Sequence, residues 1–167
     1  MRILLKHFAG LSAVGMFIPG VQLSEGVLLP SKSIGIVQYA KISNLKKRKQ
    51  AAQLSLRLLK LTLLVSFPLV LLLVVIPSSL YANLLGEDFR STPQVIGFMG
   101  VGILALAGEV ILSRYFSGTG QQKVNASSSS LGLVVTLIAG FTLIPMFGML
   151  GAAVTSSLSF LSMVLYL

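Results

Sequence analysis

Cysteine is absent from this chain of 167 residues, histidine occurs once, and only four residues are acidic. Without cysteine, the chain can form no disulfide, no thiolate nucleophile and no thiolate metal site. A single histidine, His7, cannot build a histidine-based metal site or a catalytic triad. The acids are too scattered for a pair of catalytic carboxylates: Glu25, Glu87, Asp88 and Glu109. We therefore expect no enzyme and no cofactor.

Charge in general is scarce. Only 10% of the residues are charged and 54% are hydrophobic, whereas a soluble domain carries about 25% charged residues. Too few polar groups are present to cover a surface in water, which indicates an integral membrane protein. The 13 basic residues give a net charge of +9. In a soluble protein that excess would suggest nucleic acid, but here the bases cluster beside apolar runs, as in cytoplasmic loops, and we expect no nucleic-acid partner.

The apolar runs predict four crossings in the second part of the chain. A spanning helix needs about 20 apolar residues. Residues 61–86 and about 95–116 each suit one crossing. Residues 124–167 contain no charge and are long enough for two, near 127–146 and 149–167, separated by IPMFGMLGAA. Pro145, Gly148 and Gly151 in that stretch favour a tight turn.

The first forty residues are less regular. MRILLKHFAGLSAVGMFIPG resembles a signal peptide, but no small-residue cleavage site follows it. We expect an uncleaved, proline-interrupted membrane segment within residues 8–38. The predicted fold is thus all-α, a polytopic membrane bundle of about four to five transmembrane helices. It has an ill-defined membrane segment at 1–40, a basic cytoplasmic loop or amphipathic helix at 41–60, and a four-helix region at 61–167.

The loops alternate in charge, which predicts the orientation. Residues 82–94 carry two acids and one base, the 146–151 turn carries no charge, and two other loops are basic. Under the positive-inside rule, loops 41–60 and 114–124 face the cytoplasm. A single crossing before Lys41 would place Arg2 and Lys6 on the outer side, against the positive-inside rule. The N-terminal segment is therefore expected to be re-entrant, or another segment precedes it. The bases of 41–60 are Lys41, Lys46, Lys47, Arg48, Lys49, Arg57 and Lys60.

LKKRKQAAQLSLRLLKL allows two interpretations. Leu54, Leu58 and Leu61 recur at helical spacing while Arg57 and Lys60 lie off that stripe. This pattern suits an amphipathic helix lying on anionic inner-leaflet lipids. The alternative is a topogenic loop whose helix continues directly into the membrane.

Glu109 lies about two-thirds of the way through the second crossing. A charge at that depth is costly unless it faces water or a partner. Arg114 is five residues away, so the two side chains do not share a helical face. Glu109 could handle substrate or a coupling proton, or it could be a structural acid near the inner headgroups or paired with a base elsewhere. Arg114 itself suits the end of a helix, with its guanidinium extended to the headgroups.

Small residues recur every four positions in the last crossing. Gly148, Ala152 and Ser156 form one such row, and a second row runs from Gly151 to Ser159. Rows of this kind let membrane helices approach closely. The serines of NASSSS, at 125–130, begin the returning helix.

Several motifs resemble one transporter superfamily. These are the VLLPSKS segment, the LLG-x-x-F loop at 84–89, the Y-F-x-G-x-G turn before K-x-N, and the L-I-P-x-x-G-x-x-G-A-A hairpin. Together they resemble the C-terminal part of O-antigen and capsule-unit flippases in the multidrug/oligosaccharidyl-lipid/polysaccharide exporter superfamily. The resemblance covers about residues 25–167.

The resemblance implies a function in the bacterial plasma (inner) membrane. Such proteins flip undecaprenyl-diphosphate-linked oligosaccharides for cell-surface polysaccharide or lipopolysaccharide, using two helical bundles around a partly cationic cavity. With four or five helices, this chain resembles one half, and we expect a missing N-terminal half or a second copy as its partner. The cavity candidates are Arg57, Lys60, Glu109, Arg114 and Lys123, although each base also suits a topogenic role. A multidrug cation antiporter half and a non-transporting membrane scaffold are the alternatives.

Overall fold

The structure is a computed structural model that describes residues 2–45 and 47–167, so Lys46 of the basic loop lies outside the described residues. Within these ranges the chain forms helices and no strands, which confirms the all-α class. The elements are α1 (Arg2–Val27), α2 (Leu29–Ser43), α3 (Arg48–Val75), α4 (Ser78–Leu85), the 3-10 helix η1 (Glu87–Phe89), α5 (Thr92–Gly118) and α6 (Gln122–Tyr166).

Three helices, α3, α5 and α6, are long and apolar enough to cross a membrane. The segment Ala13–Val27 and helix α2 meet at an angle of 42°, and as a pair they are long and apolar enough for a fourth, broken span or for a re-entrant loop. The outer surface is apolar: Leu64 is 73% exposed and Ile138 is 65% exposed. Side chains of this kind are stable against lipid and unfavourable against water. The chain is therefore a multi-pass membrane helix bundle, as its composition predicts.

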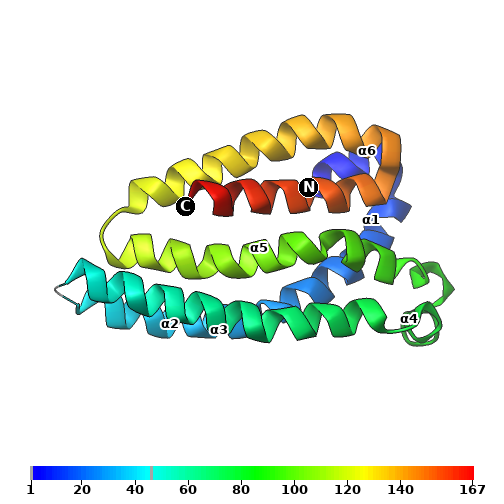
Figure 1. The fold of residues 1–167 in the computed structure, drawn as a ribbon. Coiled ribbons are helices and arrows are strands. Elements are labelled where there is room, and N and C mark those ends of the chain that lie inside the picture. Colours follow the sequence, from blue (N-terminus) through cyan, green and yellow to red (C-terminus); the bar gives the residue numbers. More distant parts are fainter. Residues whose placement is uncertain (1, 46) are drawn as a thin grey trace.

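The 45 residues of α6 form two arms that reverse direction at Gly148 (Figure 1). Gly148 has φ +53° and ψ −123°, a backbone conformation that side-chain-bearing residues rarely adopt. A Cβ atom at Gly151 would collide with the main-chain carbonyl of Leu143, so glycine also permits the close approach of the arms. The predicted break between the last two crossings is confirmed.

Hydroxyl groups join the two arms of α6. Ser128 Oγ donates to the carbonyl of Met163 over 3.0 Å, and Ser159 Oγ donates to the carbonyl of Gly132 over 2.9 Å. Thr136 Oγ1 donates to Ser159 Oγ over 2.9 Å. Because the lipid interior offers no water to these groups, the hydroxyls are satisfied by the opposite arm. Of the four serines at 127–130, Ser128 therefore belongs to the packing seam, and the other three are exposed.

Helix α5 is the centre of the bundle, lying between α6 and the pair α2 and α3 in Figure 1. In the most apolar stretch of α5, half of the residues are buried, whereas the buried share of the corresponding stretch is 17% in α3 and 11% in α6. The second arm of α6 packs tightly against it: a Cβ at Gly102 would lie 2.5 Å from the Cα of Ser157. Ser157 Oγ donates to the carbonyl of Phe98 over 2.8 Å. Ser157 belongs to neither of the two predicted rows of small residues, although five of the six members of those rows are also buried.

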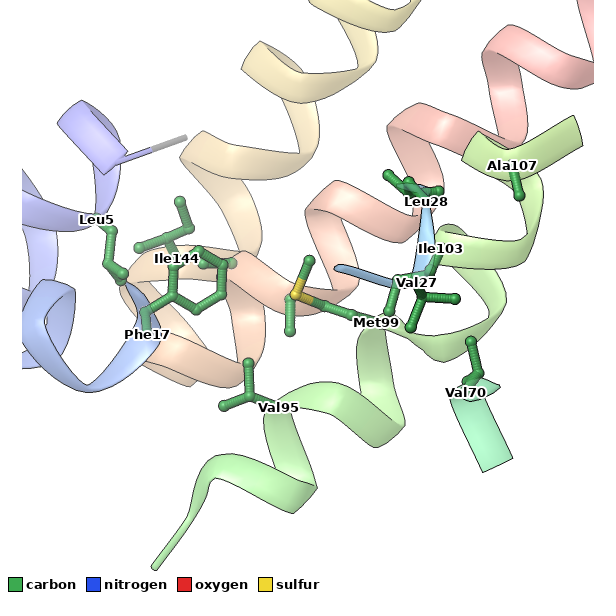
Figure 2. Packing of buried hydrophobic residues seen from close by; sticks show 12 residues of the cluster. Leu5, Phe17, Val27, Leu28, Val70, Val95, Met99, Ile103, Ala107 and Ile144 are labelled. Atoms are coloured by element: carbon green, nitrogen blue, oxygen red, sulfur yellow. The ribbon is translucent and has the colours of Figure 1, made fainter. Parts of the chain in front are cut away.

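The apolar core runs along the inner faces of α1, α5 and α6 (Figure 2). Residues before Gly10, which has φ +83°, fold back and bring Leu5 against Phe17 and Ile144. The N-terminus consequently lies beside α6 in Figure 1. Further along α5, Met99 and Ile103 continue the core toward the bend between α1 and α2.

The two basic loops lie at the same end of the bundle (Figure 1). Asn44, Leu45 and Lys47 lie between α2 and α3, and the turn between α5 and α6 covers residues 119–121. The acidic η1 and the reversal at Gly148 lie at the opposite end. Helix α3 runs without interruption from Arg48 into the leucine-rich run, so most of the basic segment 41–60 is continuous with a span.

Candidate functional site

Arg57 and Lys60 lie on the outer face of α3. The buried side of this helix is polar and small, and it includes Ser55, Thr62 and Ser66. At about 100° per residue, Arg57 and Lys60 point away from that stripe, and both are exposed. They therefore face the surroundings of the bundle and not its interior.

Glu109 lies on the side of α5 that faces α6. It is half-buried and shares its helical face with Gly102 and Ser113, seven residues before and four residues after it. Gly102 packs on Ser157, and the carbonyl of Ser113 accepts a 2.9 Å hydrogen bond from Asn125 Nδ2. Both neighbours thus contact α6.

Arg114 lies on a different side of α5, against α2. A Cβ at Gly35 would lie 3.2 Å from Arg114 Cγ and 3.8 Å from its Nε, so the side chain passes directly over this glycine. Arg114 and Glu109 do not share a face, as expected. Within residues 2–45 and 47–167 the one salt bridge joins Arg90 to Glu87 at 3.7 Å, near the opposite end.

The five predicted cavity residues therefore do not gather in one place. Two lie on the outer face of α3, Glu109 faces α6, Arg114 faces α2, and Lys123 is exposed in the first turn of α6. Among them, only Arg114 lies beside the broken span formed by α1 and α2.

Two charged residues of that broken span were missed by sequence reasoning. Lys32 is exposed on α2, one turn before Gly35, and Glu25 is exposed seven residues earlier, on the other side of the bend near Leu28. From Lys32 to the end of α2 at Ser43 the helix rises about 16 Å, about half of a bilayer core. The signal was present in VLLPSKS, a lysine within an apolar run, but without a helix boundary its depth could not be assigned.

A buried polar seam holds α2 beside α3 and α5. Gln38, which is fully buried, donates from Nε2 to Ser55 Oγ over 2.9 Å and to the carbonyl of Ile111 over 3.0 Å. The hydroxyl oxygens of Ser31 on α2 and Ser66 on α3 lie 3.4 Å apart, two turns of α2 before Gln38. Hydrogen bonds of this kind fix the position of a helix in lipid. The seam therefore sets the orientation in which α2 presents Lys32.

The basic side chains beside the bent pair α1 and α2 offer positive charge and hydrogen-bond donors. The described residues contain no group of three or more His, Asp or Glu side chains that could hold a metal ion. Lys32 and Arg114 can attract a phosphate or diphosphate as charged hydrogen-bond donors.

A family model, "Lipid II flippase MurJ", matches residues 14–167. The chain belongs to this family. Two curated proteins are similar to this chain over nearly all of the chain's length. The capsular polysaccharide biosynthesis protein CapF of Staphylococcus aureus is 25% identical over 99% of the chain and 43% of the relative. The uncharacterized membrane protein MJ1068 of Methanocaldococcus jannaschii is 26% identical over 92% of the chain and 31% of the relative. No solved structure gives a significant match.

These matches confirm the expected family at a general level, that of flippases for lipid-linked saccharide precursors. Members of the MurJ family are transporters, which agrees with the prediction that the chain is not an enzyme. The chain spans less than half the length of the two curated relatives.

Proposed function

We propose that this chain forms one helical bundle of a flippase for undecaprenyl-diphosphate-linked oligosaccharides in the bacterial plasma membrane. The substrate would be a unit of cell-surface polysaccharide, moved from the inner to the outer leaflet. The observation that carries the proposal is the exposed Lys32, a cation about halfway along the depth of the bundle. A charge at that depth is costly in lipid and is usually retained for a substrate or ion path.

Arg114 and Lys32 give this path two successive cationic positions. Arg114 lies four residues from the end of α5, about 6 Å from the basic end of the helix. Its side chain crosses Gly35, one turn from Lys32. A diphosphate entering from the cytoplasmic leaflet would meet Arg114 first and Lys32 at half depth. Glu25, beyond the bend, would weaken binding on the outer side and favour release.

The other predicted site residues would have different roles. Arg57 and Lys60, on the outer face of α3, suit anionic inner-leaflet lipids better than a transported diphosphate. Lys123 suits a topogenic role in the cytoplasmic turn 114–124, and loop 41–60 would face the same side. Glu109 would act within the α5–α6 interface.

A complete path requires a second wall facing Lys32. The partner would be an upstream half of the transporter or a second copy of the chain. Complementation tests both: the chain is expressed alone, and with an upstream half from a relative, in cells lacking their own exporter, and surface polysaccharide is measured. Restoration only with the upstream half would identify that half as the second wall, whereas restoration by the chain alone would identify a second copy.

Charge variants test the role of Lys32 in the same cells. Lys32→Gln should reduce surface polysaccharide at least tenfold, while Lys32→Arg should retain most of it. Lys47→Gln, which changes a cation in the turn between α2 and α3, serves as the matched control and should remain active. Full activity of Lys32→Gln at normal protein abundance would contradict the proposal.

A further inference from the structure

A groove follows the exposed side of the seam between α2 and α3, from the basic end of the bundle toward its middle. It consists of two adjoining hollows of about 680 Å³ and 310 Å³, which share Val37, Lys41 and Leu54 as lining residues. Ile34 and Leu58 line its deeper part. Among the lining residues that the structure describes, Lys41 is the one that carries a charge. This α2–α3 groove is therefore mainly apolar, with a single cation built into its wall.

Lys41 lies at the depth of the lipid headgroups. It is two residues before the end of α2 at Ser43, a rise of about 3 Å. A lysine side chain can extend its ammonium over that distance. Ile34, in the deep part of the groove, is seven residues before Lys41 and about 10 Å deeper. Since half of a hydrocarbon core is about 15 Å, the groove below Lys41 stays within one leaflet.

The charge of Lys41 is not neutralised by the walls of the groove. Residues 26–86 contain no acid, so neither α2 nor α3 brings a carboxylate to it. Over residues 2–45 and 47–167, Lys41 takes part in no salt bridge. Lys47, exposed in the turn that follows α2, adds positive charge at the same end. The ammonium of Lys41 is therefore available to an anion from outside the bundle.

The groove lies apart from the path proposed for the transported substrate. Lys41 follows Lys32 by nine residues, which places the two side chains on opposite sides of α2 at about 100° per residue. Neither Lys32 nor Arg114 lines the groove. Arg114 instead contacts the buried face of α2 at Gly35. Binding in the groove is thus a question separate from transport.

We propose that the α2–α3 groove binds an anionic glycerophospholipid from the leaflet at the basic end, with its phosphate at Lys41 and one acyl chain along Val37 and Leu58. A lysine that lines an apolar groove at headgroup depth matches a lipid whose negative charge lies directly above its chain. A zwitterionic lipid carries its own cation beside the phosphate, so it gains less from Lys41. A polyprenyl phosphate shares the anionic head, but its chain is much longer than a groove that ends about 10 Å below Lys41.

A tryptophan reporter tests the groove directly, because the chain contains no tryptophan. Val37→Trp places the reporter in the groove at a position that is 55% exposed. Leu131→Trp is the control, on an uncharged, exposed stretch of α6 at comparable depth. The full chain is reconstituted in bilayers containing brominated phosphatidylglycerol or brominated phosphatidylcholine, and fluorescence quenching gives the relative binding constant. We expect phosphatidylglycerol to be preferred on the order of fivefold at Val37→Trp and not at Leu131→Trp.

Charge variants complete the test. Lys41→Gln combined with Val37→Trp should remove the preference, and Lys41→Arg should keep it. Lys49→Gln is the matched control and should also keep it, because Lys49 precedes Leu58 by nine residues and lies on the opposite side of α3. If Val37→Trp folds poorly, Ile34→Trp reports from the same groove.

Two kinds of result would overturn the proposal. The first is equal quenching by the two lipids, or a preference that Lys41→Gln leaves unchanged. The second is displacement of brominated phosphatidylglycerol by an equal fraction of undecaprenyl phosphate, which would assign the groove to a polyprenyl lipid.

Discussion

The phenol of Tyr81 donates a 2.7 Å hydrogen bond to the main-chain carbonyl of Leu73. In a continuous helix, that carbonyl would accept from the residue four positions later, which is Pro77 and has no N–H. The side chain of α4 therefore replaces the missing backbone donor at the end of α3. Tyr81 itself is buried, with 5% of its surface exposed.

Tyr81→Phe should lower the free energy of unfolding by about 1 kcal/mol, because the Leu73 carbonyl loses its donor while the ring packing is kept. Thermal unfolding in detergent measures the change. Tyr39→Phe, at a tyrosine 42% exposed, should have no effect. Equal stability of the two variants would show that the bond contributes nothing.

The same tyrosine predicts a pH dependence. Burial raises the pKa of the Tyr81 phenol, so the folded state resists ionisation more than the unfolded state does. Stability is then unaffected at neutral pH and falls as the pH rises above about 10, where the unfolded phenol ionises. Unfolding temperatures of the wild type and Tyr81→Phe should converge at high pH. A constant difference across that range would refute the assignment.

Gly102→Ala should destabilise the bundle by about 1–3 kcal/mol, because its new methyl group would meet the backbone of Ser157, which cannot rotate away. Gly97→Ala is the matched control on the same helix, since nothing lies within 4 Å of its added Cβ. We expect Gly97→Ala to be neutral or slightly stabilising in detergent unfolding. Tolerance of both substitutions would mean that α5 and α6 are farther apart than described.

Gln38→Leu should cost about 0.5–1.7 kcal/mol, since it removes two hydrogen bonds that join α2 to α3 and α5. Gln53→Leu, on the exposed side of α3, is the control. A double-mutant cycle with Ser55→Ala isolates the bond between the two side chains. If the cycle shows no coupling energy between Gln38 and Ser55, the seam does not orient α2.

Single cysteines can map the orientation directly, because the chain has none of its own. Lys47→Cys and Gln122→Cys, the latter at the exposed start of α6, should react with a membrane-impermeant maleimide only after cell lysis, whereas Asp88→Cys should react in intact cells. The reason is that the two basic turns share one end of the bundle and η1 lies at the other. The reverse labelling pattern would contradict the cytoplasmic assignment of loops 41–60 and 114–124.

The same reporters test the topogenic role of two bases. Alanine at Arg114 or Lys123 should increase the fraction of inverted molecules more than it impairs export by correctly inserted ones. Lost export with unchanged topology would instead place these bases in substrate handling.

Sequence reasoning predicted the features that depend on local pattern. The tight turn among Pro145, Gly148 and Gly151 follows from glycine chemistry, and the reversal occurs at Gly148. The face separation of Glu109 and Arg114 follows from helical spacing alone. Both could be read without knowing what packs against them.

Features that depend on distant contacts could not be predicted. The fold-back at Gly10 is stabilised by Leu5 packing near Ile144, far along the chain. Lys32 was missed because the depth of a residue in the bilayer can be calculated only when the ends of its helix are known. The boundaries of α1 and α2 are not marked by charge. Ser128 was expected to begin a helix, but its bond to Met163 depends on the register of the α6 arms.

The seam between the arms of α6 has a consequence for biosynthesis. If the first arm entered the bilayer alone, hydroxyls such as those of Ser128 and Thr136 would meet lipid without their partners on the second arm. The arms should therefore leave the translocon together, as one helical hairpin. A nascent chain halted just after Gly148 would leave its last segment waiting in the insertion machinery, exposed to quality-control proteases.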